Sequence, residues 1–140
     1  DFKKTFLHGH TFTANPVACS AAIASLNLYE KDKTFEKISK INDVHKNFLT
    51  LLSKTSKISK IRVLGSIAAF DLNYPGIKYG SDGIEILKKL FLKKGLLLRP
   101  IGKTIYIMPP FCIDINILEE CYKKIYDVLS MNKLNKILGS

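Results

Sequence analysis

The 140 residues carry a formal net charge of +10 at neutral pH, and 46% of them are hydrophobic. This composition is ordinary for one soluble globular domain, and no apolar stretch approaches the roughly 20 residues that a membrane-spanning helix needs. The three cysteines, Cys19, Cys112 and Cys121, are widely spaced and odd in number, which favours reduced thiols in a cytoplasmic protein over a disulfide framework or a zinc site.

The basic charge could also attract nucleic acid, because phosphates bind cationic side chains without regard to sequence. The lysines are nevertheless scattered along the polar parts of the chain and form no Arg-rich or aromatic-interleaved block. This pattern favours a solvated, lysine-rich surface. A basic nucleic-acid-binding module remains the alternative.

Two helices are predicted in the first part of the chain. Asn15 followed by Pro16 is typical of a helix start, with Asn as the N-cap and Pro in the first turn, and residues 31–33 end that helix. A second helix follows, because apolar side chains recur at helical spacing. They are Phe35, Ile38, Ile41, Val44 or His45, Phe48 and Leu52.

A buried strand or a pair of strands is predicted after a polar loop at 54–60. The run 61–72 is apolar on both faces except for Arg62, Ser66 and Asp71. Gly65 is expected to mark a β-bulge or a close approach of the backbone. The sequence Asn-Tyr-Pro-Gly at 73–76 predicts a turn.

The remaining chain predicts a helix, two strands and a helix. Ser81 or Asp82 is expected to cap the third helix, and Gly95 to end it. The inward-facing residues of this helix are Ile84, Leu87, Leu90 and Phe91. Two short strands, 96–98 and 104–108, flank a turn at 99–103.

Asp114 or Asn116 begins the last predicted helix, and the tail from Asn132 is expected to be frayed. The inward-facing positions of this helix are Leu118, Cys121, Ile125 and Val128 or Leu129. The order of elements predicts a two-layer α/β fold, in which helices cover a small, mainly antiparallel sheet.

Arg99 is one of only two arginines, whereas the chain has twenty lysines. It ends an apolar run, and Pro100 and Gly102 lie in the residues that follow. A guanidinium is planar and permanently charged, and it can hold a carboxylate or phosphate through two parallel hydrogen bonds. The sequence therefore predicts that Arg99 lies at a strand end, on a rigid turn, and binds an anion.

A second candidate for anion binding precedes the first helix. Gly9, Thr11 and Thr13 combine a glycine with hydroxyl groups just before a helix N-terminus, where backbone N–H groups can face an anion. Alternatively, the threonines only cap the backbone and the glycine only serves a turn.

Other reactive side chains give weaker indications. His8 and His10 could share a metal ion in a strand, but no further carboxylate or cysteine lies near them, so no metal site is predicted. His45 is expected to be a satisfied, partly buried side chain. Cys112 has no evident base beside it and is not expected to be a nucleophile.

Taken together, residues 8–19 and 99–110 resemble segments of class III, pyridoxal-phosphate-dependent aminotransferases of fold type I. The first segment, from His-Gly-His-Thr-Phe to Asn-Pro-Val-Ala-Cys, is similar to the one that ends the large domain in that class. The second, from Arg-Pro-Ile-Gly-Lys to Met-Pro-Pro, is similar to the branch that acts in biotin synthesis. The resemblance covers nearly the whole chain, which would be the C-terminal part of such an enzyme.

The resemblance implies a role for four of these residues. Thr11, with the backbone at His10, would bind the phosphate of pyridoxal 5'-phosphate. In this family that contact reaches the cofactor of the neighbouring subunit, which implies a homodimer with a shared active site. Gly9 would line the substrate pocket, and Arg99 would pair with the carboxylate of the keto-acid acceptor.

The resemblance also divides the chain. Residues 1–14 would end the large cofactor-binding domain, 15–31 would form a connecting helix, and 32–140 would form the C-terminal small domain. The lysine that forms a Schiff base with the cofactor belongs to the large domain in this family, as does the aspartate at the pyridine nitrogen. No catalytic residue is therefore expected here, and these 140 residues alone are not expected to transaminate. The chain has no initial Met and opens in mid-pattern, which agrees with a fragment.

The reaction implied for the full-length protein transfers an amino group from S-adenosylmethionine to 8-amino-7-oxononanoate and gives 7,8-diaminononanoate. The substrates would be small molecules, without nucleic acid or membrane as a partner. An alternative is another class III aminotransferase that acts on an ω-amino or keto acid.

Overall fold

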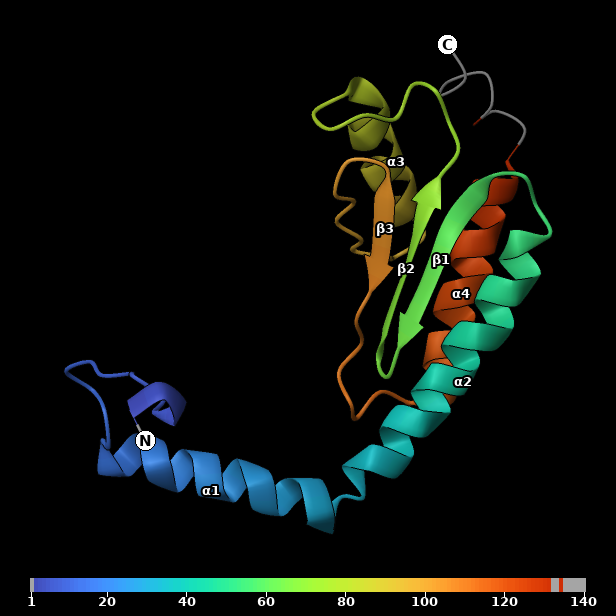
Figure 1. Cartoon of the computed structure of the whole chain (residues 1–140). Helices are drawn as coiled ribbons and strands as arrows, with labels where there is room; N and C mark the ends of the chain where they lie inside the picture. The colour runs from blue at the N-terminus through green and yellow to red at the C-terminus, as the bar shows by residue number, and fades with distance from the viewer. Residues whose placement is uncertain (1, 132–133, 135–140) are drawn as a thin grey trace. The chain divides into compact units, whose positions relative to one another are not determined.

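The computed structural model describes residues 2–131 and 134 (Figure 1). The chain divides into two compact units, Asp1–Phe35 and Glu36–Ser140, and each is described here by itself. The fraying predicted from Asn132 falls outside the described residues except at Leu134, which is buried. No helix in the described ranges is long and apolar enough to cross a bilayer.

The first unit consists of a short 3₁₀ helix, η1 (Phe2–Lys4), a loop and helix α1 (Pro16–Lys31). The predicted start of α1 is confirmed, because the Asn15 side chain accepts hydrogen bonds from the backbone N–H groups of Val17 and Ala18. No residue of α1 is buried. Its apolar side chains are therefore available to other surfaces.

Helix α2 (Thr34–Ser53) begins in the first unit and continues through the second. The predicted inward face is largely confirmed, and both Val44 and His45 are buried. Phe35 is an exception, because its side chain is exposed and its ring lies beside Tyr29, with 5.8 Å between the ring centroids.

The second unit contains a three-stranded antiparallel sheet in the order β1-β2-β3. The predicted strand pair is β1 (Ile58–Leu64) and β2 (Ile67–Leu72), so β1 begins within the predicted loop 54–60. Strand β3 (Thr104–Ile107) pairs with β2.

The expectation of a bulge at Gly65 is wrong. The register shifts between Ser59 and Arg62 instead, where Lys60 has a positive φ of 48°. Gly65 occupies the first position of the two-residue turn between β1 and β2, with φ 56°, where hairpin turns favour glycine. The close approach predicted there is confirmed, since a Cβ on Gly65 would lie 3.3 Å from Ile38 Cγ2.

Helices α3 (Asp82–Lys93) and α4 (Ile115–Ser130) agree with the predictions. Ser81 precedes α3, and Gly95 ends it with φ 76°. Asp114 caps α4, because its carboxylate accepts a hydrogen bond from the N–H of Asn116.

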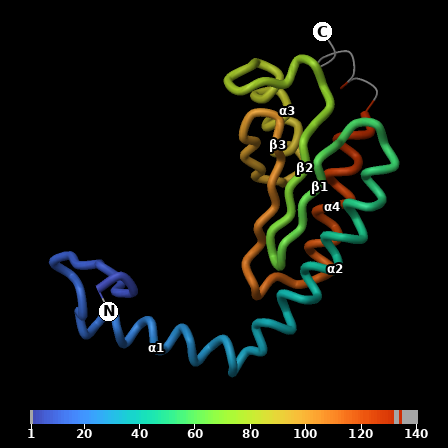
Figure 2. The backbone as a smooth tube through the Cα atoms, viewed as in Figure 1, coloured from blue at the N-terminus to red at the C-terminus, as the bar shows by residue number. Residues whose placement is uncertain are grey.

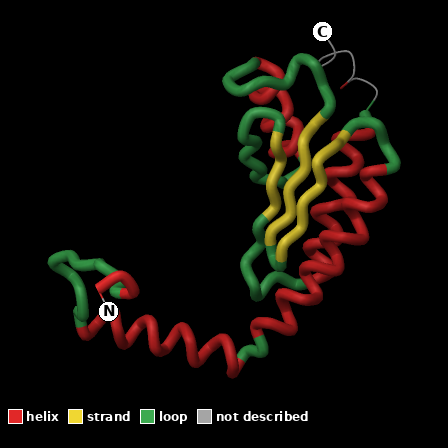
Figure 3. The backbone as a smooth tube through the Cα atoms, viewed as in Figure 1, coloured by secondary structure: helices red, strands yellow, loops and turns green. Residues whose placement is uncertain are grey.

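The predicted strand at 96–98 does not form. The N–H of Leu96 donates to the carbonyl of Phe91 and closes the end of α3, so it is not available to a sheet. Residues 96–100 are loop in the structure (Figure 3) and follow an irregular path beside β3 (Figure 2). The only sheet-like pairing outside the strands in the described residues joins Ile101 and Thr104.

One face of the sheet carries the core. The buried strand residues Ala68, Phe70, Leu72 and Ile105 belong to the same apolar cluster as side chains of α2, α3 and α4, and Figure 1 shows these helices on one side of the sheet. The two-layer α/β fold with a small antiparallel sheet is thus confirmed.

Candidate functional site

The loop before α1 is folded by its own side chains. The N–H of His10 donates to Thr13 Oγ1 over 3.0 Å, and the N–H of Phe12 donates to His10 Nδ1 over 3.1 Å. Thr13 therefore has the local capping role that was one of the two alternatives for this segment.

Thr11 is different from Thr13. It is exposed, and neither its hydroxyl nor its N–H bonds to any residue in the described part of the chain. Gly9 has no positive φ, and a Cβ added there would meet nothing within 4 Å. Thr11 thus offers two donors, and no local contact requires a glycine at position 9.

Four rings follow one another along this loop: Phe6, His8, His10 and Phe12. Successive ring centroids lie 5.3, 5.2 and 6.4 Å apart. Within residues 2–131 and 134, no group of three His, Cys, Asp or Glu side chains could hold a metal ion.

The turn that carries Arg99 is closed by two backbone hydrogen bonds. The N–H of Ile101 donates to the carbonyl of Thr104 over 2.9 Å, and the N–H of Thr104 donates back over 3.0 Å. Gly102 adopts φ 56° within this turn, and the backbone N of Tyr79 lies 3.8 Å from where a Cβ on Gly102 would be. The predicted turn is therefore present and packed against the loop at 77–80.

Arg99 itself is exposed and forms no hydrogen bond or ion pair with a described residue. It borders two hollows of about 350 and 380 Å³. The first hollow lies between the segment at 95–99, the end of β3 and helix α4. Its lining includes Leu96, Leu98, Ile107, Met108, Leu118 and Ile125.

Sequence reasoning missed a polar cluster below this turn. The buried carboxylate of Asp71 accepts hydrogen bonds from Thr104 Oγ1 (2.8 Å) and Arg62 Nη2 (3.1 Å), and Lys103 Nζ lies 4.0 Å away. Burial alone would raise the pKa of Asp71, but these hydrogen bonds and the charges of Arg62 and Lys103 together lower it below its ordinary value. The signal for this cluster in the sequence was Asp71 itself, a charged residue within an otherwise apolar run.

His45 is buried and satisfied, as predicted. Its Nδ1 lies 2.7 Å from the hydroxyl of Tyr122, and its Nε2 lies 3.0 Å from the carbonyl of Ser66. Cys19 and Cys112 are exposed, and Cys121 is partly buried. Gly9, His10 and Thr11 lie together in the first unit, whereas Arg99 belongs to the second.

Comparison with known proteins identifies close relatives. A family model described as aminotransferase class-III matches residues 2–129. Adenosylmethionine-8-amino-7-oxononanoate aminotransferase from Synechococcus elongatus is 38% identical over 126 residues, which are 89% of this chain and 29% of that protein. The chain thus spans less than a third of the length of this relative.

Solved structures agree with the sequence comparison. The crystal structure of adenosylmethionine-8-amino-7-oxononanoate aminotransferase from Methanocaldococcus jannaschii matches with a TM-score of 0.74 and 27% identity, over 92% of this chain and 31% of that one. Acetylornithine aminotransferase from Elizabethkingia anophelis matches with a TM-score of 0.73 and 30% identity, over 90% of this chain and 33% of that one. The fold is that of fold-type I, pyridoxal-phosphate-dependent aminotransferases. Because the family model covers nearly every described residue, and solved relatives share the fold, this chain belongs to the class III aminotransferases.

Proposed function

We propose that the full-length protein transfers an amino group from S-adenosylmethionine to 8-amino-7-oxononanoate, giving 7,8-diaminononanoate in biotin synthesis. The observation that carries this proposal is the unpaired guanidinium of Arg99 beside an apolar hollow of about 350 Å³. The names of the relatives from Synechococcus elongatus and Methanocaldococcus jannaschii point to the same reaction.

The acceptor has two chemical features that these residues fit. Its carboxylate would form two parallel, charge-assisted hydrogen bonds with the planar guanidinium of Arg99. Its methylene chain would lie along apolar side chains such as Leu98 and Met108. This contact would be favourable because it removes alkyl surface from water. Arg99 would thereby fix one end of the acceptor and present the keto group to the reacting centre.

The cofactor of this proposal is pyridoxal 5'-phosphate, which supplies the electron sink for amino transfer when it is bound. Its phosphate needs hydrogen-bond donors, and Thr11 offers an exposed hydroxyl and an N–H that have no partner among the described residues. The donor set therefore fits a phosphate. His10 would contribute through the backbone of the same turn, which Thr13 Oγ1 holds in shape. No neighbouring atom requires a glycine at position 9. This supports a role for Gly9 in lining the substrate pocket.

The proposal includes a cytoplasmic homodimer with a shared active site. The homodimer is supported because α1 and the loop before it expose their Phe, Leu, Ile and Val side chains, which suits a segment that packs on another subunit or domain. In the same proposal, residues 1–14 end the large domain, 15–31 connect, and 32–140 form the small domain. The lysine that binds the cofactor then lies outside these 140 residues, which would be inactive alone.

The test uses the purified full-length protein loaded with pyridoxal phosphate. With 8-amino-7-oxononanoate as acceptor, we expect S-adenosylmethionine to support formation of 7,8-diaminononanoate, measured by mass spectrometry. Acetylornithine and ω-amino acids are the comparison donors, because the acetylornithine enzyme shares this fold equally well. Turnover with those donors and none with S-adenosylmethionine would assign the protein to another class III activity.

A further inference from the structure

The carboxylate of Asp71 is the central polar group beneath the turn that carries Arg99. Its side chain is only 6% exposed. Its Oδ1 accepts two hydrogen bonds, from Thr104 Oγ1 at 2.8 Å and from Arg62 Nη2 at 3.1 Å. A buried carboxylate is tolerated only where such partners replace water.

These partners link all three strands of the sheet. Arg62 lies on β1, Asp71 on β2 and Thr104 on β3, and the Cα atoms of Asp71 and Thr104 are direct partners in the antiparallel register. The N–H of Leu72 also donates to the carbonyl of Lys103 over 2.9 Å. The first residue of β3 is thus fixed to β2 through both backbone and side chain.

Thr104 connects this cluster to the turn. Its backbone forms both hydrogen bonds that close the turn at Ile101. Pro100, which follows Arg99 directly, has a φ restricted by its ring. The two hydrogen bonds and the ring of Pro100 therefore limit the rotational freedom of the backbone between Thr104 and Arg99.

Arg99 has no other support that would set its direction. It forms no hydrogen bond or ion pair among the described residues, and its side chain is long and rich in rotamers. The turn therefore fixes the backbone from which this side chain starts, and the hydrogen bonds at Ile101 and Thr104 are the order that the structure shows there. Binding to a side chain on a fixed backbone costs less conformational entropy than binding to one on a mobile backbone.

We propose that Asp71 is a positioning residue for the acceptor: through Thr104, its carboxylate holds the turn so that Arg99 meets the acceptor carboxylate. Asp71 does not touch the substrate. This inference rests on the proposed function, because it assigns the anion at Arg99 to the acceptor. The hydroxyl of Thr104 and the Oδ1 atom of Asp71 are the two atoms that carry the effect.

The test compares three variants of the full-length enzyme loaded with cofactor. Asp71→Ala and Thr104→Val remove one side of the contact, whereas Asp71→Asn keeps an oxygen in the place of Oδ1, which accepts both hydrogen bonds. We expect Asp71→Ala and Thr104→Val to raise the KM for the acceptor roughly 5- to 10-fold, the effect of one lost hydrogen bond. The kcat and the donor half-reaction should change by less than about twofold, and Asp71→Asn should stay near wild type.

Glu120→Gln is the matched control. It removes a carboxylate from an exposed pair with Lys124 on α4 and leaves the turn intact, so its KM should equal that of wild type. If Asp71→Ala and Thr104→Val lower the melting temperature but leave the acceptor KM unchanged, the role is structural and the proposal is wrong. An equal loss in both half-reactions also contradicts it. If Asp71→Ala fails to fold, the KM for the acceptor in the milder variant Thr104→Val decides between these outcomes.

A second readout separates this inference from the proposed function. Amide hydrogen exchange at Ile101 and Thr104 reports the order of the turn without any substrate. If Arg99→Ala leaves acceptor use unchanged, the proposed carboxylate role fails. Faster exchange in Thr104→Val would then still support Asp71 as the residue that orders the Arg99 turn, and unchanged exchange would overturn it.

Discussion

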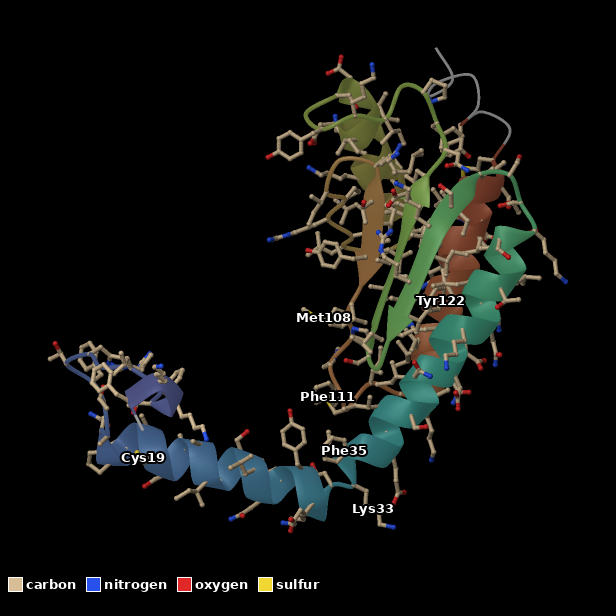
Figure 4. All side chains as sticks on the ribbon, viewed as in Figure 1. Cys19, Lys33, Phe35, Met108, Phe111 and Tyr122 are labelled. Carbon is tan, nitrogen blue, oxygen red and sulfur yellow. The ribbon has the colours of Figure 1, made fainter. Side chains whose placement is uncertain are left out.

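At the residue scale, His45 shows how a polar group is kept inside this core. It lies on α2, and its Nδ1 is 2.7 Å from the hydroxyl of Tyr122 on α4. Tyr122 is labelled in Figure 4. The hydroxyl of Tyr122 donates to Nδ1 when Nε2 donates to the carbonyl of Ser66, so neutral His45 satisfies all three groups. Burial lowers the pKa of His45, and the hydrogen bond to Ser66 only partly offsets this.

The lowered pKa of His45 predicts a loss of stability in mild acid. The unfolded state binds a proton more readily, so the contribution of neutral His45 is complete above about pH 6.5 and is lost as the pH falls toward the folded pKa. We expect the free energy of unfolding to fall by at most about 1.4 kcal/mol per pH unit in this window. His45→Gln, which does not titrate, should show a flatter dependence in urea titrations at pH 7 and pH 5.

Asp71 serves as a reference for this measurement, because its contribution to stability changes in a different pH range. Its lowered pKa means that its contribution is present above its ordinary value of 3.8 and is lost only in stronger acid. Equal pH dependence in wild type and His45→Gln would contradict the role given to His45.

At the element scale, local chemistry determined which predictions succeeded. Asn15 and Asp114 cap helices through their own side chains, and such contacts depend on a few neighbouring residues. The run at 96–98 could not be assigned in this way, because a short apolar run also suits a buried loop. The N–H of Leu96 is bonded at the end of α3, and Pro100 has no N–H to donate to β3.

The turn at 99–103 gives a prediction for a single glycine. Gly102 has a φ of 56°, in the left-handed region, so Gly102→Ala should cost roughly 1–2 kcal/mol in the free energy of unfolding. The matched control is Gly9→Ala. Gly9 has no positive φ, and a Cβ added there would meet no atom within 4 Å. Urea titration should therefore show a loss for the first variant and a change below about 0.5 kcal/mol for the second. Equal stabilities would mean that the turn does not hold Gly102 in this conformation.

At the scale of the whole molecule, the sequence singled out candidate site residues, whereas the polar cluster and the hollow beside Arg99 became visible only in the structure. Arg99 stood out as a rare arginine on a turn, and Thr11 as a hydroxyl before a helix. The Asp71 cluster was not predicted, because it joins Arg62, Asp71 and Thr104 through pairing of three strands, and the register of that pairing is a tertiary property. Likewise, the hollow beside Arg99 is lined by the loop at 95–99, the end of β3 and helix α4, and this arrangement is also a tertiary property.

The charge of +10 is spread along the chain and is not gathered in one segment. The family assignment accounts for nearly the whole chain. The described structure pairs several lysines with nearby carboxylates or carbonyl groups, as at Lys57, Lys88 and Lys124. These contacts leave the net charge at +10, and an excess of one sign of charge favours solubility.

The most direct test of the account is a single-turnover comparison of the two half-reactions in Arg99→Ala and Arg99→Lys. The donor half-reaction with S-adenosylmethionine and the acceptor half-reaction with 8-amino-7-oxononanoate are followed separately by cofactor absorbance. We predict that Arg99→Ala weakens acceptor use about 10- to 100-fold, the effect of losing a charged hydrogen-bond pair. The donor half-reaction should stay within about twofold of wild type, and Arg99→Lys should recover only part of the loss. An equal decrease in both half-reactions would contradict the assignment of Arg99 to the acceptor carboxylate.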